Sequence, residues 1–188
     1  DIVINEIFAD PSPIVGLPDK EFIEIHNRSS QTIDLTGWTI KDASTTKGTL
    51  SASSIEAGAY AMICKSADES LFSPFGQVII ASTIPSLNND MDSVILRNAA
   101  GDLIDMVYYK DSWYGTAVKK DGGYTLELIN PTLSCSGDGN WIGSNAIIGG
   151  TPGTVNSVIN NTPDNTAPSI LSYSVSSPNT VVLNYSEA

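Results

Sequence analysis

Residues 21–27 read Glu21-Phe22-Ile23-Glu24-Ile25-His26-Asn27. Successive side chains of a β-strand point to opposite faces, so Ile23 and Ile25 share one face and His26 lies on the other. The alternation predicts a strand whose isoleucines enter a hydrophobic core. It leaves His26 facing away from that core.

The same period-two pattern recurs along the chain, in segments bounded by Gly, Pro, Asn or Asp. Only Asp68–Phe72 reads as a turn of helix. Many short strands separated by turn residues predict an all-β sandwich. We expect its strands at Ile2–Phe8, Glu21–Asn27, Ile33–Asp42, Tyr60–Cys64, Val78–Ala81, Ser93–Arg97, Leu103–Tyr109 and Tyr124–Ile129.

The composition changes after Gly153. Val155–Ala167 is rich in Asn, Thr and Pro, which is typical of a linker or of a weakly packed closing strand. Alternation resumes in Ser169–Val175 and Thr180–Tyr185, as expected of a hairpin, and a hairpin alone is too small to be stable. We therefore expect a sandwich over residues 1–157, a linker over 158–168, and over 169–188 the first strands of a following domain.

The charge and hydrophobicity of the chain limit the kinds of partner that it is expected to bind. Acidic residues outnumber basic ones 21 to 9, for a formal net charge of −12. The sequence has no run of basic residues, because Lys119-Lys120 is followed at once by Asp121, so we expect no nucleic-acid partner. The longest apolar stretches, such as Val78–Ala81, are far shorter than the roughly 20 residues of a membrane helix. We expect no membrane insertion.

Three motifs follow one another in the first quarter of the chain: Val3-Ile4-Asn5-Glu6-Ile7, the run at residues 21–27, and Ile33-Asp34-Leu35-Thr36-Gly37-Trp38-Thr39-Ile40-Lys41-Asp42. Together they resemble the opening of a lamin tail domain. Later motifs resemble the version found in exported proteins of Bacteroidetes-like bacteria: Asp121-Gly122-Gly123-Tyr124-Thr125-Leu126-Glu127 and Gly149-Gly150-Thr151-Pro152-Gly153. The resemblance covers about residues 1–157 and implies an immunoglobulin-like β-sandwich.

The resemblance also implies a role. Bacterial relatives are accessory modules beside enzymes and surface proteins, and the tail from Thr166 to Glu187 is similar to the first strands of a bacterial immunoglobulin-like domain. We expect a non-catalytic module of a secreted or cell-surface bacterial protein, acting as a spacer, adhesion or protein-interaction element. Its expected partners are neighbouring domains, another protein or a surface glycan. The nucleic-acid contacts of nuclear lamin tails are not carried over to so acidic a chain.

The two cysteines, Cys64 and Cys135, lie far apart and have no CxxC spacing. Composition alone leaves two alternatives open, a pair of unrelated buried thiols and one long-range disulfide. The resemblance favours the disulfide, because bacterial relatives carry cysteines at similar positions.

The sequence offers few residues from which a catalytic site could be formed. His26 is the only histidine, and the sequence holds no GxSxG elbow. Glu6, Glu21 and Glu24 are formally a carboxylate set for glycoside hydrolysis. In the family that the chain resembles, such glutamates recur in strands, where we expect them to satisfy backbone and loop groups. We therefore expect no enzymatic activity.

The alternative function is a carbohydrate- or calcium-dependent ligand-binding domain. Trp113 and Tyr114 stand in a loop-like segment and offer stacking faces for a sugar, although a packed loop anchor is the plainer role. Asp10, Asp19 and Glu21 flank a Pro- and Gly-containing loop where oxygen ligands can hold calcium, although solvated carboxylates are the plainer interpretation. The leading expectation is a module without a cofactor.

Overall fold

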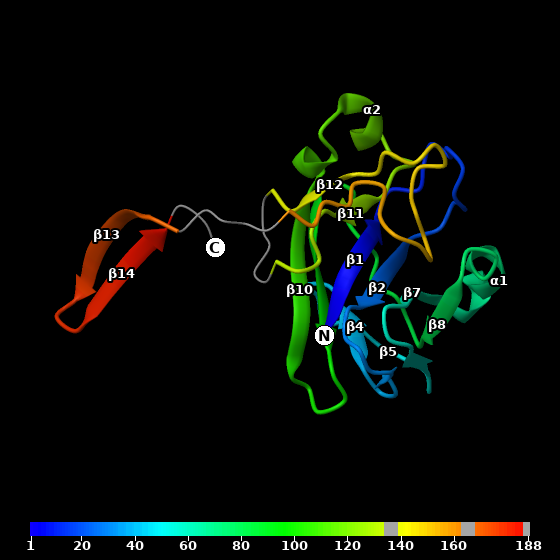
Figure 1. The fold of residues 1–188 in the computed structure, drawn as a ribbon, viewed down its shortest axis with the longest axis horizontal. Helices are drawn as coiled ribbons and strands as arrows, with labels where there is room; N and C mark the ends of the chain where they lie inside the picture. Colours follow the sequence, from blue (N-terminus) through cyan, green and yellow to red (C-terminus); the bar gives the residue numbers. More distant parts are fainter. Residues whose placement is uncertain (134–138, 163–167, 186–188) are drawn as a thin grey trace.

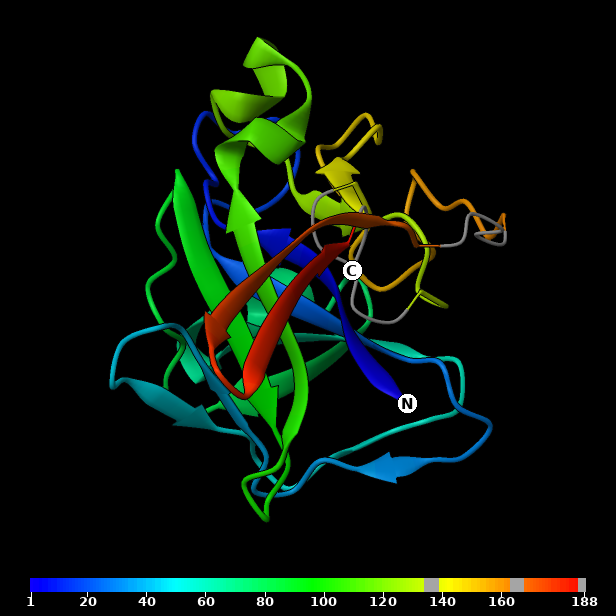
Figure 2. The ribbon, with the colours of Figure 1, turned by 90° about the vertical axis from the view of Figure 1, so that its left-hand side faces the viewer.

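The computed structural model describes residues 1–133, 139–162 and 168–185. Its main body consists of two facing β-sheets (Figures 1 and 2). The larger sheet has the spatial order β12 (Trp141–Gly143), β11 (Leu126–Leu128), β1 (Ile2–Phe8), β2 (Phe22–Asn27), β7 (Tyr60–Lys65) and β8 (Gln77–Ala81). The smaller sheet has the order β10 (Leu103–Lys110), β9 (Met91–Arg97), β4 (Thr39–Lys41) and β5 (Lys47–Thr49). The expected all-β sandwich is confirmed.

Pairing within both sheets is antiparallel, except between β7 and β8, which run parallel. A separate pair of short strands, β3 (Ile33–Asp34) and β6 (Ser54–Ile55), flanks the sandwich. The helical turns are η1 (Ser66–Asp68), α1 (Glu69–Phe72), η2 (Asp111–Tyr114) and α2 (Ala117–Lys120). The predicted turn of helix at Asp68–Phe72 is confirmed by α1, but the expectation that it is the only one is wrong, because η2 and α2 also form.

The core has two parts, one on each face of the larger sheet. Ile23 and Ile25 point between the two sheets, as predicted, and belong to the main cluster. On the other face, Phe22 packs against Phe8 and Phe72, with ring centroids 5.5 Å and 5.2 Å away. The central strands are therefore buried on both faces, and β2 carries no solvated face.

The single strand expected over Ile33–Asp42 is wrong. Residues 33–34 pair with β6, whereas residues 39–41 pair with β9 in the smaller sheet. Between them Trp38 N–H donates to the Leu35 carbonyl at 3.0 Å, and Gly37 takes a φ of 74°, a left-handed conformation that favours glycine. The chain changes partner at this turn, and side-chain alternation does not reveal such a change.

Three short strands, β5, β6 and β12, were not predicted. In β5 the reason is Gly48, which reads as a turn residue in the sequence. In the fold Gly48 lies against the backbone of Thr83, because a Cβ at this position would lie 1.9 Å from the Thr83 carbonyl oxygen. Glycine is thus required by packing within a strand.

The C-terminal part forms a hairpin of β13 (Ile170–Ser177) and β14 (Thr180–Tyr185), as expected. All of its residues in these two strands are exposed, and Figure 1 shows it apart from the sandwich. The first residues of the expected linker are hydrogen-bonded to the sandwich: Val158 N–H donates to Glu127 and Asn160 N–H to Ile129. Hydrogen bonds to the sandwich thus extend beyond residue 157, and the division into domains stays a prediction.

Asn156 joins the end of the sandwich to its beginning. Its side chain is 3% exposed, and its Nδ2 donates to the carbonyls of Asn5 at 3.0 Å and Leu128 at 2.8 Å.

We expect Asn156→Ala to lower the free energy of unfolding by about 1–3 kcal/mol, because two buried carbonyls lose their donor. Urea denaturation measures this change. Asn160→Ala, whose exposed side chain bonds only locally to Thr162, serves as the control and should cost less than about 0.5 kcal/mol. Equal effects of the two substitutions would contradict this role of Asn156.

Candidate functional site

Three glutamates lie in a row across the larger sheet. Glu6 of β1 is directly opposite Glu24 of β2 and Glu127 of β11. All three are 0% exposed. Burying three carboxylates is costly unless hydrogen-bond donors surround them. The local structure around this row must therefore supply donors.

The donors come mainly from residues 149–158, which we call the strap. The backbone N–H of Thr151 donates to Glu6 Oε1 at 2.8 Å, and that of Gly153 donates to Glu24 Oε2. Glu127 accepts from the Thr151 hydroxyl at 3.0 Å and, at 2.8 Å and 3.2 Å, from Ser157 Oγ and Val158 N–H. The interpretation that Glu6 and Glu24 satisfy backbone and loop groups is confirmed.

Burial changes the acidity of this row. It raises the pKa of Glu24 to about 8, the hydrogen bonds from Gly153 and Asn5 opposing the shift. Burial also raises the pKa of Glu6 well above its usual range, helped by the charge of Glu24. Glu6 Oε2 is buried without a hydrogen-bond partner. A proton on this oxygen is therefore the form that the site favours, and the row is a structural network under the strap.

The stability of the chain should depend on these protons. A raised folded-state pKa means that the folded chain binds more protons than the unfolded chain, from about pH 4.5 to about pH 8. The stabilisation from Glu24 is thus fully present below pH 4.5 and is lost as the pH rises through 8, and the raised pKa of Glu6 acts in the same direction. We expect the melting temperature to fall by several degrees over this range.

Thermal melts of Glu24→Gln test this dependence. The variant should be less sensitive to pH than the parent chain, since glutamine stays neutral. Glu56→Gln is the matched control, because Glu56 is exposed and bonds to Thr32, and it should retain the parental pH profile. A melting temperature that rises steadily from pH 4.5 to pH 8 would contradict the assignment.

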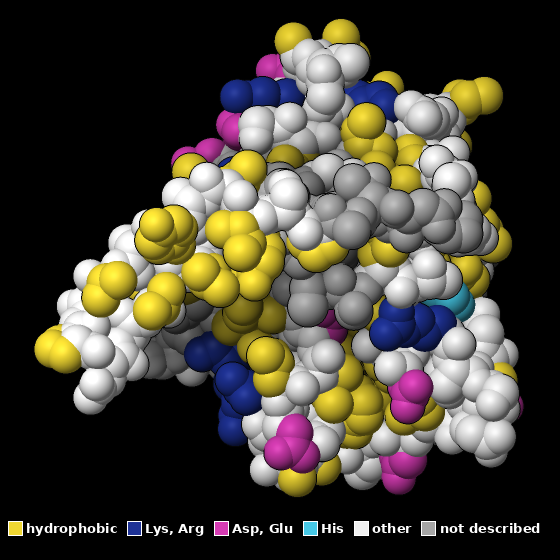
Figure 3. Space-filling view, turned by 60° about the vertical axis from the view of Figure 1, so that its left-hand side comes forward, with side chains coloured by type: hydrophobic (Ala, Val, Ile, Leu, Met, Phe, Trp, Pro, Cys, Tyr) yellow, Lys and Arg dark blue, Asp and Glu magenta, His cyan; other side chains and the backbone are white. Residues whose placement is uncertain are grey.

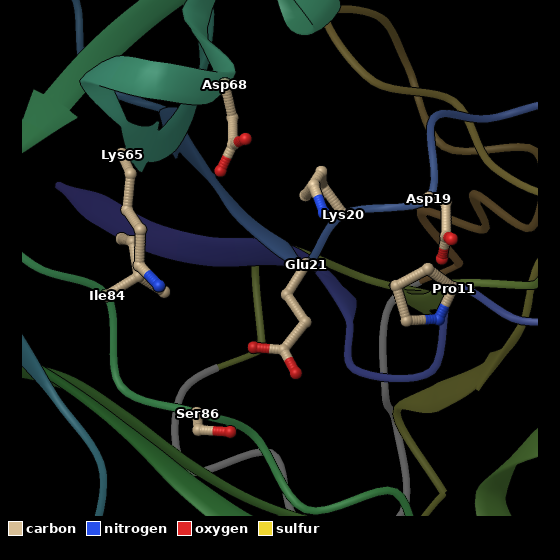
Figure 4. Close-up of a pocket in the computed structure, with 8 residues that line it drawn as sticks. All are labelled: Pro11, Asp19, Lys20, Glu21, Lys65, Asp68, Ile84 and Ser86. Carbon is tan, nitrogen blue, oxygen red and sulfur yellow. The ribbon is translucent and has the colours of Figure 1, made fainter.

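A pocket opens at one end of the sandwich, beside α1 and the start of β2 (Figure 4). It has a volume of about 290 Å³. Charged side chains of both signs dominate its wall, where Glu21 accepts a hydrogen bond from Leu87 N–H at 3.3 Å and burial raises the Glu21 pKa. The lining residues are Pro11, Asp19, Lys20, Glu21, Lys65, Asp68, Ile84 and Ser86.

The pocket brings together two of the three residues predicted to hold calcium, Asp19 and Glu21, whereas Asp10 does not line it. It also places Lys20 and Lys65 beside them, and the positive charges of these two ammonium groups would repel a calcium ion. In the described part of the chain, no group of three or more His, Cys, Asp or Glu side chains has an arrangement that could hold a metal ion. Asp19 accepts from the Ser12 hydroxyl at 3.2 Å, as a loop carboxylate does. The geometry is that of a mixed-charge pocket rather than a calcium cage.

The proposed stacking residues belong to the packed part of the molecule. Trp113, in η2, is partly buried and stacks on Trp141, with ring centroids 6.5 Å apart and an interplanar angle of 17°. Tyr114 is 2% exposed. Tyr114 therefore presents no face to a sugar, and the loop-anchor interpretation fits both residues. The sequence did not indicate that Trp141 is the partner of Trp113.

His26 is packed against an aromatic side chain. Its ring stacks on Tyr60 at 4.3 Å between centroids, with an interplanar angle of 10°. The Nδ1 atom is buried without a hydrogen-bond partner, and burial lowers the pKa of the ring. An imidazole poised as a general base needs an orienting group at Nδ1, and His26 lacks one among the described residues.

Cys64 lies in the smaller core cluster, and burial raises the pKa of its thiol to about 11. Cys135 lies outside the described residues, so its pairing with Cys64 stays a prediction. The described residues nearest to it lie beyond the Leu128 end of β11, whereas Cys64 follows Ile63 at the Phe22 end of β7.

Thiol counting tests the pairing. A disulfide predicts no titratable thiol in the denatured, unreduced protein, and reduction should then cost roughly 4 kcal/mol for a closed loop of about 70 residues. Two titratable thiols would rule the bond out.

Comparison with known proteins places the fold in a family. The lamin tail domain family model matches residues 1–111, more than half of the chain, and the chain therefore belongs to this family. Lamin tail domains are immunoglobulin-like and non-enzymatic, which confirms the expected fold class. No curated protein matches the chain. Within the described residues, no helix has the length and apolar character needed to cross a membrane.

Proposed function

We propose that the chain is a non-catalytic interaction module of a larger bacterial protein that is secreted or held at the cell surface. The observation that supports this proposal is that the side chains able to take part in acid–base chemistry are packed within the structure. The glutamate row lies under the strap, and His26 is stacked and partly buried. Family membership supports the same conclusion.

The C-terminal hairpin supports a role beside other domains. Tyr173 lies opposite Leu183, and Val175 lies opposite Val181, so these four side chains share one face. All four are more than one-third exposed. A two-stranded hairpin with one apolar face gains stability only when that face is covered. We propose that an immunoglobulin-like neighbour covers it and that the sandwich acts as a spacer or adhesion element next to that domain.

The second candidate is a ligand-binding domain, and the mixed-charge pocket is the observation that favours it. Its two lysines and three carboxylates would suit a small polar ligand carrying both charges better than a bare calcium ion. Melting the chain with calcium and then with chelator tests the ion, because a ligand at 100 times its Kd adds about 2.7 kcal/mol. A glycan-binding screen with Trp113→Ala tests a sugar.

The non-catalytic proposal predicts no turnover. Reporter esters, glycosides and phosphodiesters should be hydrolysed no faster by the full chain than by His26→Ala or Glu24→Gln. Continuous absorbance assays measure these rates, with an added hydrolase as the positive control. Turnover by the parent chain that disappears in His26→Ala would overturn the proposal.

A further inference from the structure

The smaller sheet leaves one face open. Ile40 of β4 lies opposite Leu96 of β9, and both are fully buried toward the larger sheet. Neighbouring residues along a strand point the other way. The outer face of β10, β9, β4 and β5 therefore carries two cross-strand rows, Lys47–Lys41–Ile95–Met106 and Thr49–Thr39–Arg97–Leu103, followed by the pairs Ser93–Tyr108 and Met91–Lys110.

Apolar side chains gather on the β9 and β10 half of this outer face. Met106 is 53% exposed, Tyr108 51%, Leu103 51% and Met91 47%. The Tyr108 hydroxyl lies 3.2 Å from the Met91 sulfur, which joins the two strands at the surface. Figure 3 shows hydrophobic side chains beside a cluster of lysine and arginine on the face that it presents. Contiguous exposed apolar groups are uncommon on soluble proteins and mark interaction sites.

Basic side chains gather on the same face. Lys41, Lys47, Arg97 and Lys110 are four of the nine Lys and Arg residues in a chain of net charge −12. Lys41 and Lys47 are directly opposite each other, an arrangement of like charges that is destabilising in a sheet. An anionic group bound between the two ammonium groups would relieve this repulsion.

The acidic residues of these strands point inward. Asp92 is 7% exposed and lies opposite the buried Tyr109. Asp105 Oδ2 accepts a hydrogen bond from Ile4 N–H of the larger sheet at 2.8 Å. The four strands are all described, and none of them presents a carboxylate on the outer face. The face is thus basic and apolar on an otherwise acidic chain.

We infer that this outer face docks an acidic protein segment that also carries apolar side chains. The inference rests on the proposed interaction function and names its surface and its partner. Carboxylates of the partner would meet Lys41, Lys47 and Arg97, and its apolar side chains would cover Met106 and Tyr108. The partner segment would lie across the outer face of β9 and β10, where these exposed side chains are gathered.

Other anions fit this face less well. A nucleic acid would not use the exposed methionines and would be repelled by the remaining acidic surface. An anionic glycan would find a single aromatic ring, Tyr108, on the rows described above. A protein segment can contact both the basic and the apolar side chains of this face.

Fluorescence anisotropy with the full chain tests the inference. The probe is a labelled synthetic peptide of alternating Glu and Leu, compared with a peptide of alternating Glu and Ser. We expect the Glu-Leu peptide to bind more tightly, and its affinity to fall with added salt. The double variant Lys41→Glu/Lys47→Glu should weaken binding about tenfold or more, and Met106→Ser/Tyr108→Ser about threefold or more.

The matched control is Lys20→Glu/Lys65→Glu, which changes the net charge equally but lies in the pocket. It should leave the affinity within about twofold, and thermal melts establish that every variant is folded. The inference is overturned if the parent chain does not bind the Glu-Leu peptide, if both lysine pairs weaken it equally, or if duplex DNA or alginate binds more tightly than the peptide. Such a result, without turnover in the hydrolase assays, would leave the non-catalytic proposal standing.

Discussion

The burial of three carboxylates in one row constrains the rest of the sandwich. Glu6, Glu24 and Glu127 come from adjacent strands, and all of their carboxyl oxygens except Glu6 Oε2 accept hydrogen bonds away from water. The strap provides donors, so residues 149–158 are tied to the first two strands of the sandwich. Because an unpaired buried acceptor costs on the order of 1–3 kcal/mol, wrong registers of these strands are penalised several times over. Asn156 adds a bridge between the Asn5 and Leu128 carbonyls.

This constraint explains why the most recognisable sequence motifs are scattered along the chain. The Asn-Glu pair at residues 5–6, the glutamates of β2 and β11, and the Thr-Pro-Gly run at 151–153 meet in one network. Each motif alone is a short strand or a turn. Their shared role as one hydrogen-bond network is evident only in the folded chain, where the strap lies over the sheet. The sequence could predict that the glutamates were structural, but it could not predict which loop would reach them.

Local pattern predicted the strands better than it predicted their partners. Ile23 and Ile25 enter the core because period-two alternation directly reports a buried face. The break at Gly37 was missed because alternation continues through a change of sheet. Gly48 concealed β5 because a close backbone approach and a turn both require glycine. In the candidate pocket, Asp19 and Glu21 were found, but Lys65 comes from β7, and only the folded chain places it beside them.

The two sheets differ in how much of their surface is buried. Both faces of the larger sheet are covered, by the main core on one side and by the strap and the smaller core on the other. Its side chains are therefore committed to packing. The smaller sheet contributes one face to the core, and its outer face carries exposed side chains such as Met106 and Tyr108. Lys41, Lys47 and Arg97 look isolated in a sequence without basic runs, and strand register alone gathers them. Selection for binding can act on that face without disturbing the buried network, which makes it the natural place for an interaction module to carry its specificity.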